Sequence, residues 1–419
     1  MVSSNVNSGT PSFEEHSRAV ILALKGSLAD LADALPVTLA AGPTELGRAL
    51  QVDTKLAWKV TNLLEHVDPF EAGRFVPGAL AMKRFLAAAE GRDVPKALIA
   101  NARRSFERFE ELVDEHAGTR SSLDMMLASQ ASGDSQSTDL EHRKAAFRAN
   151  SYLWGVKARM QIKTVLFAPS IDDPDRVDVI LINGFVDLQR IRRNAPWRIS
   201  SAYSVDDHGE VHTGFDWSPL DPDLAVSSPT EGAPLVRAFC SKDLPDFNTL
   251  PSEAGAVHYA FREGPVGRHG SVNCVSGEVL RRAEPRYRDG PYETRATYLR
   301  LHTPCEVAIQ DLIIHRDLFE KYEPQAHLFS GLYSGELLKQ HLACDELPMR
   351  ERVEALGTGS DCGWLPEMPG YRALLGFAFE QVDWNPRDFE LQRVRMAYPP
   401  TPTALVIRQQ LPDRPAGTK

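Results

Sequence analysis

The side chains of this 419-residue sequence that could bind a metal ion lie mostly in its second half. His302 and Cys305 are three positions apart, and five further histidines and cysteines follow: His315, His327, His341, Cys344 and Cys362. Imidazole and thiolate are ligands that zinc prefers. The later spacings are irregular, Pro304 interrupts the first pair, and cysteine is often just a small buried residue. We therefore predict no metal site and no cofactor.

Arginine and glycine mark two further candidate segments. Residues 183–198 combine aromatic side chains with four arginines, and arginine with aromatic stacking can hold nucleic acid or an acidic ligand. The segment 264–270 is rich in glycine, so its backbone N–H groups could hold an anion. The candidate anion or ligand contacts are Arg190, Arg192, Arg193 and Arg268. A strand with a polar outer face and a plain surface loop are the alternative interpretations.

Familiar catalytic motifs are missing from the sequence. It has no Gly-rich nucleotide loop ending in Lys-Ser or Lys-Thr, no G-x-S-x-G elbow, no H-E-x-x-H and no paired C-x-x-C. We therefore name no catalytic residue and do not predict an enzyme. Asp311 lies beside the apolar run Leu312–Ile314, so it needs a partner such as an arginine if it is buried.

The most informative pattern is Glu45–Leu64, which follows a Gly-Pro-Thr segment that can start a helix. The first helix would carry two apolar anchors, Leu46 and Leu50, and the small residue Gly47, which lets a second helix cross it closely. The second helix would have an apolar inward face, formed by Ala57, Val60, Leu63 and Leu64. Asp53 or Thr54 can cap the second helix by accepting a backbone hydrogen bond. Two helices joined by such a short turn can place the second one in a DNA major groove.

Glu45–Leu64 resembles the helix-turn-helix of bacterial transcriptional regulators. The resemblance implies that the second helix faces double-stranded DNA through Thr54, Lys55, Lys59 and Asn62. The sequence departs from the family at the turn, where Gln51 stands in place of the common glycine. On the face toward DNA, Asp53 would repel phosphate and Trp58 is bulky.

The segment after this motif suggests a winged version of the fold. Phe70 and Phe75 flank Gly73 and could form a small hairpin with Arg74 at its tip, as a further DNA contact; a plain loop is the alternative. From Arg74 to Arg108 eight basic residues face three acidic ones: Arg74, Lys83, Arg84, Arg92, Lys96, Arg103, Arg104 and Arg108 against Glu90, Asp93 and Glu107. These residues form either a basic surface or ordinary solvated helix faces.

The segment Val94–His116 carries small and apolar residues at heptad spacing. They form two rows: Ile99, Phe106 and Val113, then Ala102 and Phe109. Such a seam requires another helix. It predicts either a homodimer or packing against the helix Arg18–Leu35 of the same chain.

A change of composition divides the chain. We predict a helical domain over residues 1–127, a Ser-rich linker over 128–139, an α+β domain over 140–410 and a disordered tail over 411–419. The first domain is all-α, with the helix-turn-helix and a dimerisation helix. The second is mixed and mainly antiparallel, rich in β-strands and with helices, and it resembles no family that we recognise.

The predicted elements of the second domain follow from hydrophobic alternation and turn residues. Helices are predicted over about Asp139–Met160, over Leu347–Leu356 and over Tyr371–Phe379, and Pro219–Gly255 is predicted as an extended surface insertion. Strands are predicted over Gln161–Phe167, Arg176–Ile182, Trp197–Val205, Val257–Phe261, Val272–Leu280, Arg295–His302, Glu306–Ile314, Glu390–Tyr398 and Thr403–Arg408.

Overall composition limits the class of protein. With 42% hydrophobic and 25% charged residues the chain can bury a core, and a net charge of −10 argues against nonspecific coating of nucleic acid. The sequence has neither a secretory signal nor an apolar run long enough for a membrane span. The five scattered cysteines are typical of reduced thiols. We therefore predict a cytoplasmic protein without a membrane partner.

The predicted function is a DNA-binding transcriptional regulator with a C-terminal domain that senses a ligand or mediates assembly. Its expected partners are double-stranded DNA, a second copy of the chain and an unknown small ligand or protein. One alternative is a non-catalytic protein-interaction module that uses Trp58 as an anchor. The other is an enzyme with an unrecognised site in the C-terminal domain.

Overall fold

The chain folds into two compact units, Met1–Asp139 and Leu140–Lys419. The computed structural model describes residues 12–35, 42–92, 94–131, 136–195, 197–202, 204–205, 211–212, 216–251, 257–288, 293–318, 324–331 and 345–415. Helices and mixed β-sheets are both present, so the predicted α+β class is confirmed. Within the described ranges, no helix combines the length and the apolar character that a bilayer crossing requires.

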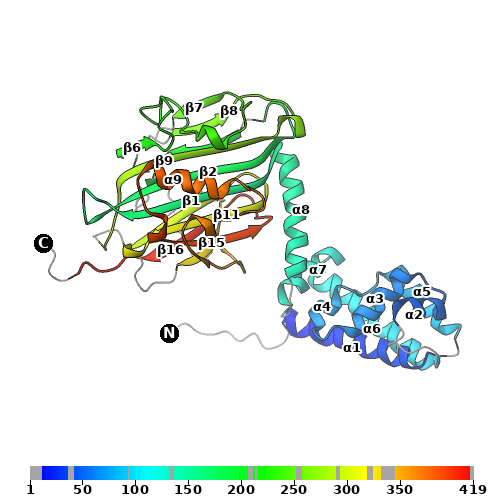
Figure 1. The fold of residues 1–419 in the computed structure, drawn as a ribbon. Helices are drawn as coiled ribbons and strands as arrows, with labels where there is room; N and C mark the ends of the chain where they lie inside the picture. The colour runs from blue at the N-terminus through cyan, green and yellow to red at the C-terminus, as the bar shows by residue number, and fades with distance from the viewer. Residues whose placement is uncertain are drawn as a thin grey trace. The chain divides into compact units, whose positions relative to one another are not determined.

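The first unit is helical (Figure 1). Its helices are α1 (Phe13–Asp33), α2 (Pro43–Leu50), α3 (Thr54–Glu65), α4 (Pro69–Gly73), α5 (Ala79–Glu90), α6 (Lys96–His116) and α7 (Arg120–Gln130). A capping box begins α1, because the Ser12 hydroxyl accepts from the Glu15 N–H and the Glu15 carboxylate accepts from the Ser12 N–H, both at 3.2 Å. The inward stripe of α1 is buried completely at Ile21, Leu24 and Leu28. Burial of each such side chain stabilises the fold by about 1.5–3 kcal/mol.

The seam predicted on α6 is buried inside this unit. Ile99, Ala102, Phe106 and Phe109 are at most 7% exposed and belong to the same core as α1. Helices α1 and α6 run antiparallel, because His16 near the start of α1 meets His116 at the end of α6. Of the two predicted packings, the one within the chain is therefore correct, and this seam gives no support to a homodimer.

A left-handed residue joins α2 to α3. Gln51 has φ 53° and ψ 39°, and the next residue, Val52, donates its N–H to the Gly47 carbonyl at 3.0 Å. A Cβ added at Gly47 would lie 3.3 Å from the Val52 carbonyl oxygen and 3.6 Å from the Ala57 Cβ, so α3 crosses α2 closely at this glycine. The Asp53 carboxylate caps α3 by accepting from the Leu56 N–H at 2.8 Å.

The predicted winged hairpin is wrong, because residues 69–73 form α4. Asp68 accepts from the Phe70 N–H at 2.8 Å and Pro69 takes the first helical position, which together favour a helix start. Gly73 is needed for packing: a Cβ there would lie 2.7 Å from Leu127 and 2.9 Å from Ile21. Gly73 therefore allows α4 to pack closely against α7 and α1, and it does not form a hairpin turn.

The predicted linker 128–139 is largely helical at both of its ends. Helix α7 continues to Gln130, and α8 (Gln136–Trp154) begins before the predicted domain boundary. Residues 132–135 lie outside the described part of the chain. Helix α8 ends short of the predicted Met160 because Gly155, with φ 76°, takes the left-handed conformation that terminates helices.

The second unit is built on a seven-stranded sheet in the order β14-β15-β11-β1-β2-β9-β6. Its strands are β1 (Val156–Pro169), β2 (Arg176–Arg190), β6 (Asp216–Pro219), β9 (Val272–Pro285), β11 (Cys305–His315), β14 (Glu354–Thr358) and β15 (Phe389–Ala397). Only the pair β1–β11 is parallel among the paired strands that the structure describes, in keeping with the predicted mainly antiparallel sheet.

In the described part of this unit, three smaller sheets accompany the seven-stranded one. The order β10-β16-β12-β13 joins β10 (Thr294–Leu301), β12 (Gln325–Ser330), β13 (Glu346–Leu347) and β16 (Thr403–Gln410). The order β3-β8-β7 joins β3 (Trp197–Ala202), β7 (Phe247–Pro251) and β8 (Val257–Phe261). The short strands β4 (Ser204–Val205) and β5 (Val211–His212) pair with each other.

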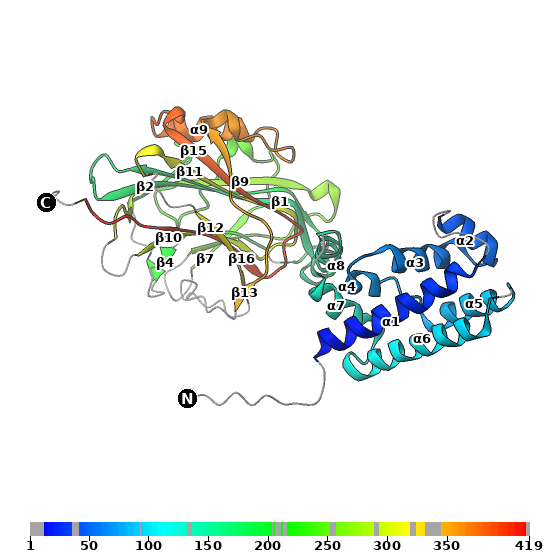
Figure 2. The same cartoon turned by 90° about the horizontal axis from the view of Figure 1, so that it is seen from below.

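Both faces of the seven-stranded sheet are covered (Figure 2). Helix α9 (Tyr371–Gln381) packs on one face, where Ile162 and Leu166 of β1 join its apolar side. The opposite face, which we call the inner face, carries Val165 and Phe167 of β1 and packs with β3, β8, β10, β12 and β16. This division follows from the alternation of side chains along a strand.

Three further sequence predictions are corrected by packing. The predicted helix Leu347–Leu356 is not formed: β13 ends at Leu347, and β14 begins at Glu354 and pairs with β15. The insertion Pro219–Gly255 is not wholly superficial, since Val236 is completely buried. The predicted tail does not begin at Leu411, which is 2% exposed and donates its N–H to the Glu293 carbonyl at 3.0 Å. Residues 416–419 lie outside the described part.

A buried ion pair between β11 and β15 also accepts a hydrogen bond from α9. Arg393 of β15 donates from Nε and Nη2 to the two carboxylate oxygens of Asp311 on β11, at 2.8 and 2.7 Å. The Tyr371 hydroxyl of α9 donates to Asp311 Oδ2 at 2.7 Å and lies 2.7 Å from Thr164 Oγ1 of β1. The expected arginine partner of Asp311 is thus confirmed. Burial raises the pKa of Tyr371 well above its ordinary value, and the Asp311 charge adds to this effect.

We predict that Asp311→Asn destabilises the second unit by about 3–5 kcal/mol, because it leaves the buried Arg393 charge without its counter-ion. Urea denaturation of the full-length chain, followed by near-UV circular dichroism, measures the change. The control is Asp216→Asn, which breaks the exposed pair with Arg282 (2.8 Å) and should cost less than about 1 kcal/mol. Equal costs for the two variants would contradict the prediction.

Candidate functional site

The residues predicted to contact DNA from α3 lie on one face of that helix. Thr54 and Lys55 are exposed, and Lys59 and Asn62 are half-buried. The opposite face is buried in the helical core through Leu56, Ala57, Val60, Thr61 and Leu63. These two sets alternate with helical spacing, so the four predicted contacts form a continuous stripe, which we call the α3 face.

The α3 face is partly engaged with its own surroundings. Asn62 donates its side-chain amide to the Trp58 carbonyl at 2.8 Å. The Trp58 ring is 46% exposed and meets Phe75 edge-on, with ring centroids 5.5 Å apart. Within the described part of the chain, Lys55 and Lys59 form no ion pair.

Arg74 does not belong to the α3 face. It follows α4 as that helix's C-terminal cap and is half-buried, and its carbonyl accepts from the Arg120 guanidinium at 3.5 Å. The other basic residues are spread over α5, α6 and the segment between them: Lys83, Arg84, Arg92, Lys96, Arg103, Arg104 and Arg108. Arg103 pairs with Glu90 at 3.1 Å. The structure thus brings together the four α3 residues and leaves Arg74 on a different element.

Two of the four candidate anion contacts hold the backbone in place. The Arg190 side chain is buried and donates to the carbonyls of Ala195 and Arg262, and burial lowers the pKa of its guanidinium. Arg192 donates to the Leu153 carbonyl. Arg193 is exposed, 3.7 Å from Glu263, and Arg268 is exposed in a short 3-10 turn. Arg190 and Arg192, two of the four candidate anion or ligand contacts, thus donate to backbone carbonyls of their own unit.

Among the described residues, the histidines and cysteines considered for zinc do not gather into a metal-binding group. Cys305 is fully buried in β11, where burial raises the pKa of its thiol to about 12. Burial, with Arg198 and Arg300 nearby, lowers the pKa of His302 to about 4. His327 contacts Glu346 at 2.7 Å, and His341 and Cys344 lie outside the described residues. A different trio, His16, Glu115 and His116, is gathered by the first unit.

A row of polar side chains crosses the inner face of the seven-stranded sheet. Lys163 of β1 pairs in register with Gln310 of β11 and with Asn183 of β2, and Asn183 pairs with Ser276 of β9. Partners in adjacent strands point to the same face. The four residues therefore form one line, which we call the inner polar row. No sequence pattern indicated it, because its four residues come from four different strands.

The inner polar row is electrostatically strained. Desolvation and the nearby Arg300 together lower the pKa of Lys163 to about 8, and Glu278 and Glu284 partly oppose the shift. Burial raises the pKa of Glu278, which accepts from the Trp217 indole N–H at 2.7 Å. Lys163 and Asn183 keep some accessible surface although they are flanked by strands on both sides.

Amide oxygens beside Lys163 have unused bonding capacity. Gln310 donates to the Thr297 carbonyl and hydroxyl, both at 2.9 Å, and Gln161 donates to the Arg300 carbonyl at 2.9 Å. The Oε1 atoms of both glutamines are buried and accept no hydrogen bond from any residue that the structure describes. Such acceptors are normally satisfied in folded proteins. The inner polar row and the adjacent Gln161 thus combine an ammonium donor with two buried amide oxygens that accept no hydrogen bond.

The chain matches no protein-family model, no curated protein and no solved structure.

We predict that the Lys163 amine titrates near pH 8, whereas ordinary lysines titrate near 10.4. The lowered pKa means that the folded chain is destabilised by holding the charged Lys163 amine, and this destabilisation is fully present below pH 8. As the pH rises from about 8 toward 10.4, the amine loses its proton in the folded chain but keeps it in the unfolded chain. The free energy of unfolding should therefore increase over this range. Carbon-13 NMR of lysine side chains measures the midpoint, and the Lys163 signal is assigned as the one that disappears in Lys163→Met. If the assigned signal does not titrate with a midpoint near pH 8, the prediction is contradicted.

Proposed function

We propose that this protein is a cytoplasmic DNA-binding transcriptional regulator, in which α3 enters the major groove of double-stranded DNA. The observation that carries the proposal is the α3 face: Thr54, Lys55, Lys59 and Asn62 share the exposed side of a helix whose other side is buried. A recognition helix needs this arrangement, because its base contacts must come from one exposed stripe on a rigid support.

The chemistry of the α3 face suits a groove. Lysine can bind phosphate or the guanine edge, asparagine can bind adenine, and the threonine hydroxyl can bond to either base edges or phosphate. Two uncompensated lysines on the helix supply local attraction, while the net charge of −10 repels nucleic acid as a whole. We therefore infer binding that is selective and sensitive to salt.

The proposal extends to the second unit, which we infer to sense a small polar ligand. The inner polar row supports this role because it offers an ammonium group and unsatisfied amide oxygens at the middle of the sheet. A ligand with both donors and acceptors would complete these bonds. Assembly through the second unit stays the alternative role.

We predict that Lys55→Ala with Lys59→Ala weakens DNA binding at least about tenfold and lowers the slope of log K against log salt by about two, because two lysines no longer bind phosphates. Fluorescence anisotropy of the full-length protein with a pool of random-sequence duplexes, between about 50 and 200 mM salt, measures both values. The matched control is Lys83→Ala with Lys96→Ala, which removes the same charge from α5 and α6.

Two results would refute this prediction. One is the absence of salt-dependent binding by the unmodified chain. The other is an equal loss of affinity in the control variant, which would mean that total charge rather than the α3 face governs binding.

A protein-interaction module is the second candidate function, favoured by the 46% exposure of Trp58 in the middle of the α3 face. Tryptophan is a frequent anchor of protein interfaces. In this case Trp58→Ala should weaken self-association by about 2 kcal/mol or more, as measured by sedimentation velocity over a range of concentrations. Trp364→Ala, which removes a similarly exposed ring (56%) from the second unit, should have no effect. A monomeric unmodified chain would exclude a homodimer.

A further inference from the structure

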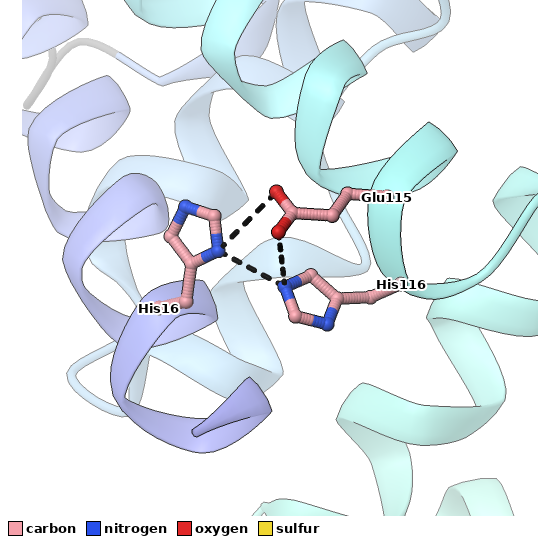
Figure 3. Close-up of side chains that lie close together, drawn as sticks. All are labelled: His16, Glu115 and His116. Carbon is pink, nitrogen blue, oxygen red and sulfur yellow. Dashed lines mark hydrogen bonds and ion pairs between the residues drawn. The ribbon is translucent and has the colours of Figure 1, made fainter. Parts of the chain in front are cut away.

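Three potential metal ligands meet where the start of α1 lies beside the end of α6 (Figure 3). His16 Nδ1 is 3.0 Å from His116 Nε2. Glu115 places one carboxylate oxygen 3.8 Å from His16 Nδ1 and the other 3.9 Å from His116 Nε2. All three side chains point toward one another, so their ligand atoms surround a common point.

The two imidazoles alone form an unusual contact. At 3.0 Å, two ring nitrogens repel if both are bare or if both carry a proton, so a single proton must lie between them. A metal ion can replace this proton and accept both lone pairs. Nitrogens bound to tetrahedral zinc lie about 2.0–2.1 Å from the ion and therefore roughly 3.3 Å from each other. The observed separation needs only a small adjustment.

The surroundings also favour a cation. His116 is the last residue of α6, whose terminal carbonyls give that helix end a partial negative charge. The first turn of α1 would oppose a cation, but Glu14 and Glu15 supply negative charge there. The His116 side chain is only 16% exposed and Phe13 covers it edge-on, with ring centroids 5.4 Å apart. Glu115 is 52% exposed, so its carboxylate can rotate toward an ion.

We propose that His16, Glu115 and His116 bind a divalent transition-metal ion, with zinc as the preferred ion. Two imidazoles and one carboxylate match the ligands that zinc accepts, and water completes the coordination. Since 100 positions separate the two histidines, the site exists only in the folded unit. The ion therefore stabilises the α1–α6 pair, and its role is independent of the proposed DNA binding.

Isothermal titration of the untagged full-length chain with zinc chloride tests this site. We expect one ion per chain at His16–Glu115–His116, and a melting temperature that rises with zinc concentration. Loss of an outer-shell partner typically weakens metal affinity by roughly 10–100-fold. We expect a larger loss of zinc affinity from His16→Gln and from His116→Gln, because each removes a direct ligand. Glu115→Gln should weaken zinc binding less than either histidine variant. His142→Gln, which changes an exposed histidine on α8, should leave both results intact.

A spectroscopic measurement covers the case in which a histidine variant fails to fold. Cobalt bound to the unmodified chain should show the visible absorption of a site with nitrogen and oxygen ligands, and X-ray absorption should count two imidazoles. Lack of binding by the unmodified chain, an unchanged isotherm in the folded His116→Gln variant, or sulfur ligands at the bound cobalt would overturn the proposal.

Discussion

The antiparallel packing of α1 on α6 is the constraint on which the first unit depends. The apolar stripe of α1, with Ile21, Leu24 and Leu28 fully buried, fills the core against the seam of α6. Residues of α3 and α4 belong to the same core, so the buried side of α3 is held and its polar side stays exposed. The same packing brings His16 to His116. Both sites proposed in this unit therefore depend on one helix pair.

The second unit depends on a different constraint, the covering of both faces of its central sheet. A charged residue on such a sheet is stable only if its hydrogen bonds are satisfied within the protein. Asp311 meets this condition, because Arg393 and Tyr371 use both of its oxygens on the α9 side. On the inner face, by contrast, desolvation and the nearby Arg300 lower the pKa of Lys163. This contrast separates a structural polar cluster from a candidate binding site.

Sequence patterns predicted local elements well where local forces decide them. The predicted strands Gln161–Phe167 and Arg176–Ile182 lie within β1 and β2, and the predicted strand Val257–Phe261 coincides with β8. The failures occurred where packing outweighs local signals. Gly73 was interpreted as a turn residue, yet it is small because α1 and α7 approach it. The predicted helix Leu347–Leu356 gave way to β14, whose hydrogen bonds to β15 no local pattern contains.

The sequence by itself determined the α+β class, the close crossing at Gly47, a cap at Asp53 or Thr54 and the need of Asp311 for a partner, because each depends on neighbouring residues or on the cost of burying a polar group. Only the tertiary structure decided where the α6 seam is buried and which arginines donate hydrogen bonds to backbone carbonyls. It also decided that His16 and His116 meet. These features depend on contacts between residues far apart in the chain. Such contacts leave no periodic signal in the sequence, so they become visible only when the helices and strands are packed.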